Sequence, residues 1–320
     1  MSTKRYDVVG LGVSTIDQLM QLDHLPAEEE ILRADAYSIQ GGGPVATAIV
    51  ALARLGARTA MIDAVGADWR GDVICSEYAR EGVDTQLLIR RAGHTSPTAL
   101  VLVRRPAGTR TIVWSPGTAP ELTVDEIPWS AIDQAAFLHV NGRHGDACLR
   151  ACEYARQHDV QVSFDGGAGR YREETRRLVP LADVCIVALE FAALYTGEPE
   201  PARAGPALLA AGPSLVAITD GLRGSWVFAR DGTFFHQPAF RVDVVDTTGC
   251  GDCYHGAFLF GLVRGMELRR TATRASAAAA LNTRALGGRK GLPTLAEVDA
   301  FVSSPDRCQP GGVAFEHGGY

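Results

Sequence analysis

Apolar runs rich in β-branched residues alternate with stretches of helical periodicity along most of the chain. The apolar runs predict strands at Tyr6–Leu11, Thr59–Val65, Ala136–Val140, Val160–Phe164, Val184–Val187 and Leu215–Thr219. The stretches between them predict helices at Pro44–Leu55, Gly71–Glu81, Gly145–Gln157, Glu173–Val179, Ala192–Thr196 and Ala202–Ala210. This alternation favours an α/β fold with a mostly parallel sheet covered by helices on both faces. Ligands bind such sheets beyond the carboxyl ends of the strands.

Two regions interrupt the alternation and predict a small β lid. Ile31–Ile39 alternates weakly, whereas Pro97–Val103 and Arg110–Trp114 flank "RRPAGT", which is typical of a hairpin turn. We expect the lid pieces at about residues 12–40 and 95–116. A second hairpin is expected at Ser225–Phe235, and the Ala-rich stretch Met266–Leu286 predicts a helix. Residues 304–320 are rich in Pro and Gly and predict a flexible tail.

Composition narrows the class of protein. The 320 residues carry a formal net charge of −6, with 46% hydrophobic and 21% charged residues. This balance is ordinary for a soluble globular protein and speaks against a nucleic-acid binder, which usually has a basic surface. We expect no signal peptide and no membrane span, because no apolar run reaches about 18 residues. Seven cysteines, an odd number, fit reduced thiols in the cytoplasm better than a disulfide framework.

The stretch "TTGCGD", Thr247–Asp252, is predicted to begin a helix. Val242–Val245 before it reads as a strand, and Ala257–Val263 after it is apolar nearly all round, as in a buried helix. Successive glycines let backbone N–H groups converge at a helix start, where the helix dipole favours an anion. A carboxylate beside a bound phosphate makes chemical sense if Asp252 removes a proton from a hydroxyl that attacks phosphorus.

Two other interpretations of this stretch stay open. A Gly-rich helix start with an acidic residue in its first turn is common in proteins that bind nothing there. Cys250 and Cys253 have the Cys-x-x-Cys spacing of a redox pair or half a zinc site, although no second cysteine pair has zinc-site spacing.

The sequence resembles the ribokinase-like (PfkB) carbohydrate kinases at two places. "DTTGCGD" followed by "HGAF" resembles the C-terminal signature of that family, and "GGGPVATAIVALARLGA", Gly41–Ala57, resembles the N-terminal one. The resemblance runs from about Tyr6 to Phe301 and implies a ribokinase-like three-layer sandwich, with one kinase domain at residues 1–303. It implies ATP-dependent transfer of a phosphoryl group to a primary hydroxyl of a small sugar, a ketose or its derivative, with Mg²⁺. It also implies a homodimer formed through the lid.

The resemblance assigns roles to single residues. Asp252 matches the general base, and the anion hole matches Gly249, Cys250 and Gly251, whose backbone N–H groups would bind the anion. The residues that match the sugar-binding positions of the family are Asp17, Gly42, Gly43, Thr47 and Arg143. The residues that match the nucleotide-binding positions of the family are Thr219, Gly221 and Gly224 of "TDGLRG", together with Ser276 and Asn282. The metal positions are Glu190, the sole acid of a degraded Asn-x-x-Glu element, and Asp246, near a site for a monovalent cation such as K⁺.

Several of these residues also have structural interpretations that stay open. Asp17 and "TDGLRG" can be turn residues, Arg143 can be a solvated loop charge, and Ser276 and Asn282 can be packing residues of a helix. Asp165, at the end of a predicted strand, is expected to point toward the same crevice as the sugar residues.

The sequence indicates the sugar substrate less clearly than it indicates the family. "GGGPVATA", "HQPAFRVDVVDTTG" and "GGRKGLP" (Gly287–Pro293) look most like sulfofructose kinases, and Arg143 resembles an arginine of ketohexokinases. However, Ile31 and Trp114 stand at the lid positions that would bind a sulfonate, where Arg33 or Arg110 can compensate. Two rivals stay open: a nucleoside kinase on the same fold, and a catalytically silent protein that senses sugars or nucleotides.

Overall fold

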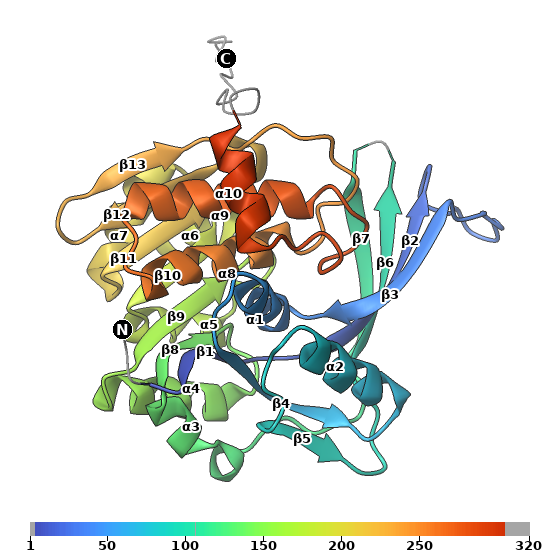
Figure 1. The fold of residues 1–320 in the computed structure, drawn as a ribbon, viewed down its shortest axis with the longest axis horizontal. Coiled ribbons are helices and arrows are strands. Elements are labelled where there is room, and N and C mark those ends of the chain that lie inside the picture. The colour runs from blue at the N-terminus through green and yellow to red at the C-terminus, as the bar shows by residue number, and fades with distance from the viewer. Residues whose placement is uncertain (1–3, 106, 305–320) are drawn as a thin grey trace.

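The predicted strands assemble into one nine-stranded sheet at the centre of the molecule (Figure 1). The structure is a computed structural model that describes residues 4–105 and 107–304. The strand order is β13-β12-β11-β10-β9-β8-β1-β4-β5. Neighbours from β5 to β11 are parallel, and β12 and β13 form an antiparallel edge. The strands are β1 Tyr6–Leu11, β4 Thr59–Gly66, β5 Leu88–Arg91, β8 Ala135–Val140, β9 Gln161–Gly166, β10 Val184–Ala188, β11 Leu215–Thr219, β12 Ser225–Ala229 and β13 Phe234–Gln237.

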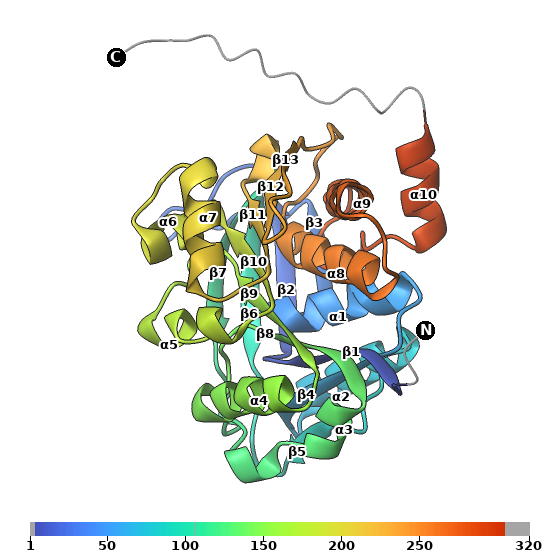
Figure 2. The same ribbon diagram turned by 90° about the vertical axis from the view of Figure 1, so that its left-hand side faces the viewer.

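Helices cover both faces of this sheet and make three layers (Figure 2). One face carries α1 Pro44–Arg54, α2 Trp69–Arg80, α8 Cys250–Val263, α9 Leu268–Asn282 and α10 Leu295–Ser303. The other carries α3 Trp129–Asp133, α4 Gly145–Gln157, α5 Glu173–Arg176, α6 Leu189–Thr196 and α7 Pro201–Ala211. Because both faces are covered, strands β1 and β4 are buried at every position, which explains their continuous apolar sequences.

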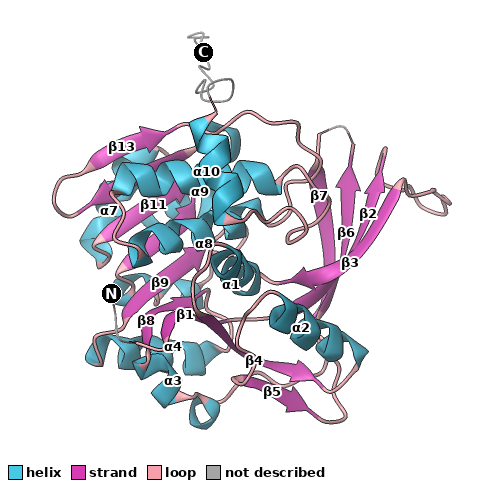
Figure 3. Ribbon diagram, in the orientation of Figure 1, coloured by secondary structure: helices cyan, strands magenta, loops and turns pink. Residues whose placement is uncertain are grey.

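A second sheet of four strands stands beside the main body and forms the lid (Figure 3). Its strands are β2 Thr15–Leu22, β3 Ala36–Gly42, β6 Thr98–Arg104 and β7 Thr109–Ser115, in the order β3-β2-β6-β7. Leu19, Val101 and Val103 are buried on its inner face, whereas Tyr37, Leu100 and Val113, which the strand pairing places on the opposite face, are exposed. The lid therefore has an apolar side that packs on the body and a second side open to solvent.

Most predicted elements are confirmed. The six predicted strands are present to within two residues, as are both hairpins and the long helices. The Ala-rich helix α9 and the buried helix α8 are also confirmed, and α8 begins at Cys250 as predicted for "TTGCGD". Each cysteine among the described residues is a free thiol. Residues 305–320 of the expected tail lie outside the described residues.

Other expectations are wrong in detail. Val242–Val245 is not a strand: Val245 instead donates its N–H to Thr283 in the α9–α10 connection. The lid strand begins at Ala36 rather than Ile31, since pairing with β2 starts there. Helix α5 ends at Arg176, and the chain continues into a 3₁₀ turn that contains Pro180. The sequence pattern missed four elements, which are short or lack clear alternation: β2, β5, α3 and α10.

Candidate functional site

The start of α8 has the form of an anion-binding site. Gly249 caps the helix with a φ of 69°, a conformation that favours glycine. The first N–H groups of any helix lack partners within it and carry partial positive charge. Asp246 holds the preceding loop, because its buried carboxylate accepts the N–H and the hydroxyl of Thr248 and the N–H of Gly287. The amides of Gly249, Cys250 and Gly251 thus lie on a braced helix N-terminus.

Asp252 lies in the first turn of α8, with a side chain that is 19% exposed. Burial raises the pKa of this carboxyl, and the charge of Arg170 opposes the rise. Arg170 Nη2 lies 3.7 Å from Asp252 Oδ1. A partly desolvated carboxylate beside an anion-binding helix start can accept a proton from a hydroxyl group that attacks a bound phosphate.

Arg170 is held in place by Asp165, at the end of β9. Its Nη1 donates to both carboxylate oxygens, at 2.9 and 2.7 Å, and the Asp165 side chain is 1% exposed. The prediction that Asp165 points into the crevice fits this position, although its direct partner is Arg170. The sequence analysis missed Arg170; the signal was "FDGGAGR", where a basic residue follows a strand-end Asp at five positions.

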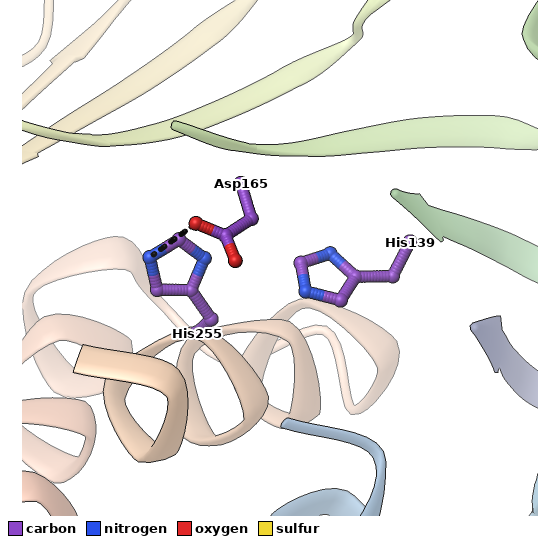
Figure 4. A group of neighbouring side chains, drawn as sticks. All are labelled: His139, Asp165 and His255. Atoms are coloured by element: carbon purple, nitrogen blue, oxygen red, sulfur yellow. Dashed lines mark ion pairs between the residues drawn. The ribbon is translucent and has the colours of Figure 1, made fainter. Parts of the chain in front are cut away.

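Two histidines lie beside Asp165, as Figure 4 shows. His139 and His255 are buried, and their rings flank the Asp165 carboxylate, with the ligand atoms of all three residues within 4.8 Å of one another. His139 Nε2 and His255 Nδ1 have no hydrogen-bond partner among the described residues. Burial lowers the pKa of His139 to about 3 and also lowers that of His255, so both rings are neutral.

This cluster is the group of described side chains with the geometry to hold a metal ion. However, Asp165 already accepts Arg170 and the N–H of Gly167. A divalent ion would add two positive charges next to the half-buried guanidinium of Arg170, around a carboxylate that is itself buried. Imidazole also suits Zn²⁺ rather than Mg²⁺. The cluster therefore serves better as support for Arg170 than as a site for the Mg²⁺ of a kinase.

The sugar-side residues Asp17 and Gly42 lie in direct contact. Asp17, on β2, is 8% exposed and accepts the hydroxyl of Thr15 at 2.7 Å. A Cβ on Gly42 would lie 2.1 Å from Asp17 Oδ2, so only glycine fits against this carboxylate. Burial raises the pKa of Asp17 to about 6, and the charge of Asp252 adds to the rise. The two carboxylates are therefore near enough for their charges to interact.

The other sugar-side candidates occupy different surroundings. Arg143, in the loop after β8, pairs with Glu121 at 2.7 Å and lies over the ring of Trp114 at 5.9 Å, so it joins the body to the lid. Gly43 begins α1 with a φ of 93°. Thr47 is 2% exposed and contacts Arg289 Nε at 3.4 Å, which places it behind the diglycine rather than on an open surface.

The nucleotide-side candidates lie around the ends of β11 and α9. Thr219 ends β11, and Gly221 begins a 3₁₀ turn that closes at Gly224, where the chain enters β12. Ser276 and Asn282 are buried on α9, and both contact the connection that leads to α8: Ser276 Oγ donates to Pro238 O and Asn282 Nδ2 to Thr248 O.

The two residues predicted to bind metal ions, Glu190 and Asp246, differ in their exposure to solvent. Glu190 is exposed in the first turn of α6, after β10. Asp246 is fully buried, and three protein donors already reach its two oxygens. Cys250 and Cys253 belong to no cluster of metal-binding side chains among the described residues.

Comparison with known proteins decides the family. The model of the pfkB family of carbohydrate kinases matches residues 8–295. The chain belongs to this family. It is 28% identical to a 5-dehydro-2-deoxygluconokinase of Shouchella clausii, over 93% of this chain and 96% of the relative. It is 26% identical to a nucleoside kinase of Methanothermobacter thermautotrophicus, over 91% and 94%. A putative ribokinase from Agrobacterium tumefaciens has a similar structure, with a TM-score of 0.82, 26% identity and coverage of 92% and 96%.

This pfkB-family kinase therefore has the ribokinase-like α/β fold and is an ATP-dependent carbohydrate kinase. The predictions of family, fold and enzyme class are confirmed. None of the described helices has the length and apolar character to cross a membrane. The open question is the sugar, because one family accepts acceptors as different as sugar acids and nucleosides.

Proposed function

We propose that this kinase phosphorylates a primary hydroxyl of a small sugar that carries an acid group, such as a keto sugar acid. The observation that carries this proposal is the pair of guanidinium groups beside Asp252. Arg170 approaches from β9, and Arg110 from β7 donates to Thr247 Oγ1 at 3.1 Å, next to the anion hole. Arg110 forms no ion pair with the residues described here, so its charge is available to an anion.

The proposed mechanism uses the two halves of the site. Asp17 and the Gly42–Gly43 backbone hold the sugar hydroxyls, with Arg143 at the lid. Asp252 takes the proton as the sugar oxygen forms a bond to the γ-phosphorus, and the bond from that phosphorus to the oxygen of ADP breaks. The amides of Gly249, Cys250 and Gly251 stabilise the charge on the transferring group. Thr219, Gly221, Gly224, Ser276 and Asn282 form the nucleotide side.

Metal and assembly complete the proposal. Mg²⁺ binds mainly through phosphate oxygens and water, as this ion often does, with Glu190 as the nearest acid of the degraded element. K⁺ binds beside Asp246. The protein acts in the cytoplasm, and a homodimer forms through the open lid face, where large apolar side chains are exposed: Tyr37, Ile39, Leu100 and Val113.

A substrate panel tests the proposal through ADP release with Mg-ATP. The panel contains 5-dehydro-2-deoxygluconate, 2-keto-3-deoxygluconate, sulfofructose, fructose, ribose, fructose 6-phosphate, adenosine and inosine. We expect the highest kcat/KM on an anionic keto sugar and a loss of at least tenfold on neutral fructose. Preference for a neutral sugar would overturn the assignment of the acid group.

A nucleoside kinase is the second candidate, because Trp114 is 54% exposed at the lid and one relative is a nucleoside kinase. Turnover of adenosine or inosine above all sugars would establish it. ATP binding without turnover of any compound would instead favour a sensing protein.

A further inference from the structure

The motif "GGRKGLP" has no role in the function described so far, although its arginine is deeply buried. Arg289 is 2% exposed and is the largest of the fully buried side chains among the described residues. Burying a guanidinium costs free energy unless hydrogen-bond and charge partners compensate. The partners of Arg289 therefore show what its burial achieves.

On one side, Arg289 holds the sugar-binding diglycine. Its Nη2 donates to the carbonyl oxygen of Gly42 at 2.8 Å, and its Nη1 lies 3.2 Å from Glu77 Oε2. The same Glu77 oxygen accepts the N–H of Gly41 at 2.5 Å. One buried ion pair thus fixes the backbone on both sides of the peptide bond that joins Gly41 and Gly42, the glycine that touches Asp17.

On the other side, the backbone around Arg289 supports the anion hole. We call residues 286–291 the bridge segment. Gly287 donates its N–H to Asp246 at 2.7 Å. Gly288 packs closely on Gly249: a Cβ added to Gly249 would lie only 2.6 Å from the Cα of Gly288. A displacement of the bridge segment would therefore also displace the loop that precedes α8.

Gln40 ties the bridge segment to the lid strand β3. Its Oε1 accepts the N–H groups of Arg289 and Lys290 at 2.9 and 3.1 Å, and its Nε2 donates to the carbonyl of Leu286 at 3.1 Å. Gln40 directly precedes the glycines that the Arg289 side chain holds. The charge of Arg289 also lowers the pKa of Asp17 against the effect of burial, which favours the ionised form that accepts hydroxyl groups.

We propose that Arg289 is a positioning residue that couples sugar binding at the diglycine to the anion hole. A sugar bound to Asp17 and Gly42 stabilises a backbone that Arg289 and Gln40 connect to the bridge segment, and this segment fixes Gly249 and Asp246. The γ-phosphate of ATP then meets an ordered anion hole when a sugar is present. Coupling of this kind is reciprocal, so ATP tightens sugar binding by the same factor. The inference rests on the proposed function.

The test measures this coupling factor directly. The Kd of the non-hydrolysable analogue AMP-PCP, with Mg²⁺, is determined by calorimetry with and without the sugar that the wild-type protein phosphorylates best. We expect the sugar to tighten binding at least about fivefold in the wild-type protein, within the usual range of coupling. Arg289→Met should reduce the factor to below about twofold and raise KM for the sugar about tenfold. Arg289→Lys, which keeps the charge, should restore part of both.

Arg54→Met is the matched control. Arg54, at the end of α1, pairs with Glu81, directly after α2, at 2.6 Å, and donates to the carbonyl oxygen of Leu292 at 2.7 Å, just beyond the bridge segment. It reaches neither Gly42 nor the bridge segment. Its loss should lower the melting temperature but leave the coupling factor unchanged.

Two outcomes would overturn the inference. The first is a folded Arg289→Met protein with the wild-type coupling factor, and the second is an equal loss of coupling in Arg54→Met. Since Arg289→Met leaves Glu77 buried without its partner, Arg289→Met/Glu77→Gln is measured beside it, with circular dichroism as the check on folding. If the wild-type protein phosphorylates no sugar of the panel, the proposed function fails as well; an active wild-type protein with unchanged coupling in the variants overturns this inference alone.

Discussion

The two halves of the proposed site are built in different ways. The phosphoryl-transfer half is one continuous segment, Gly249–Asp252, which uses backbone N–H groups of a single helix start. The sugar half is assembled from side chains and backbone of separate elements: Asp17 on β2, Gly42 on β3 and Arg143 after β8. The first half depends on local conformation, whereas the second depends on how the lid docks on the body.

This difference explains why one family serves many sugars. Backbone amides at a helix start do not depend on side-chain identity, so Cys250 can serve the anion hole through its N–H group. The sugar half changes its preference whenever a lid residue such as Arg110 or Trp114 changes. Arg170 lies beside the phosphoryl-transfer half, where it contacts both Asp252 and Asp165.

The largest effect is expected from Asp252→Asn, because it removes the general base while leaving the helix start intact. We expect kcat to fall by about 10²–10⁴-fold, the usual contribution of such a base, with the Kd of AMP-PCP changed less than threefold. Steady-state kinetics and calorimetry measure both. Asp243→Asn, an exposed Asp of the same connection, is the control and should keep its activity. Near-normal turnover of a folded Asp252→Asn protein would contradict the mechanism.

Gly42→Ala should break the sugar half alone. The new Cβ would lie 2.1 Å from Asp17 Oδ2, although the backbone at Gly42 suits any residue, so the carboxylate has to move. We expect KM for the sugar to rise about 10- to 100-fold, since small displacements at a site cost this much. KM for ATP serves as the internal control and should rise by no more than the coupling factor of about fivefold. An equal rise of both KM values would show that the halves are not separable.

Arg170→Met tests the role of the arginine that lies beside Asp252. We expect kcat to fall about tenfold, within the usual effect of losing a charged hydrogen-bond donor. The acid limb of the pH profile of kcat should move to higher pH, because Arg170 lowers the pKa of Asp252. Arg176→Met, at an exposed arginine of the neighbouring α5, is the control. A fall in kcat without a shifted pH profile would leave Arg170 as a merely structural residue.

The smallest effect concerns stability. Burial raises the pKa of Asp17 to about 6, so its charge destabilises the folded protein above pH 6, and this cost disappears as the carboxyl is protonated at lower pH. Asp17→Asn should therefore raise the free energy of unfolding at pH 7.5 by about 1–3 kcal/mol while it weakens sugar binding. Urea unfolding at pH 7.5 and 4.5 measures this. A gain of equal size at both pH values would argue against a charged, desolvated Asp17.

Much of the fold and the phosphoryl-transfer half could be predicted from local sequence. Buried parallel strands need continuous apolar runs, and a helix start that binds an anion needs glycines and an acidic residue at fixed spacing. Asp165 was predicted for the crevice for the same reason, since strand ends of a parallel sheet meet at one edge. Strand β2 was missed because its alternation is irregular: it is defined by pairing with β3 and β6, not by its own pattern.

The sequence by itself determined the elements and signatures that depend on neighbours along the chain, including the start of α8 and the family. The tertiary structure alone decided which distant residues meet. Arg170 reaches Asp252 across 82 positions only because β9 and α8 are adjacent in space, and Arg289 reaches Gly42 across 247 positions through the bridge segment. Hydrogen bonds and ion pairs act over a few ångströms, whatever the separation in sequence. The contacts of Arg170 and Arg289 with the site therefore became visible only in the folded structure.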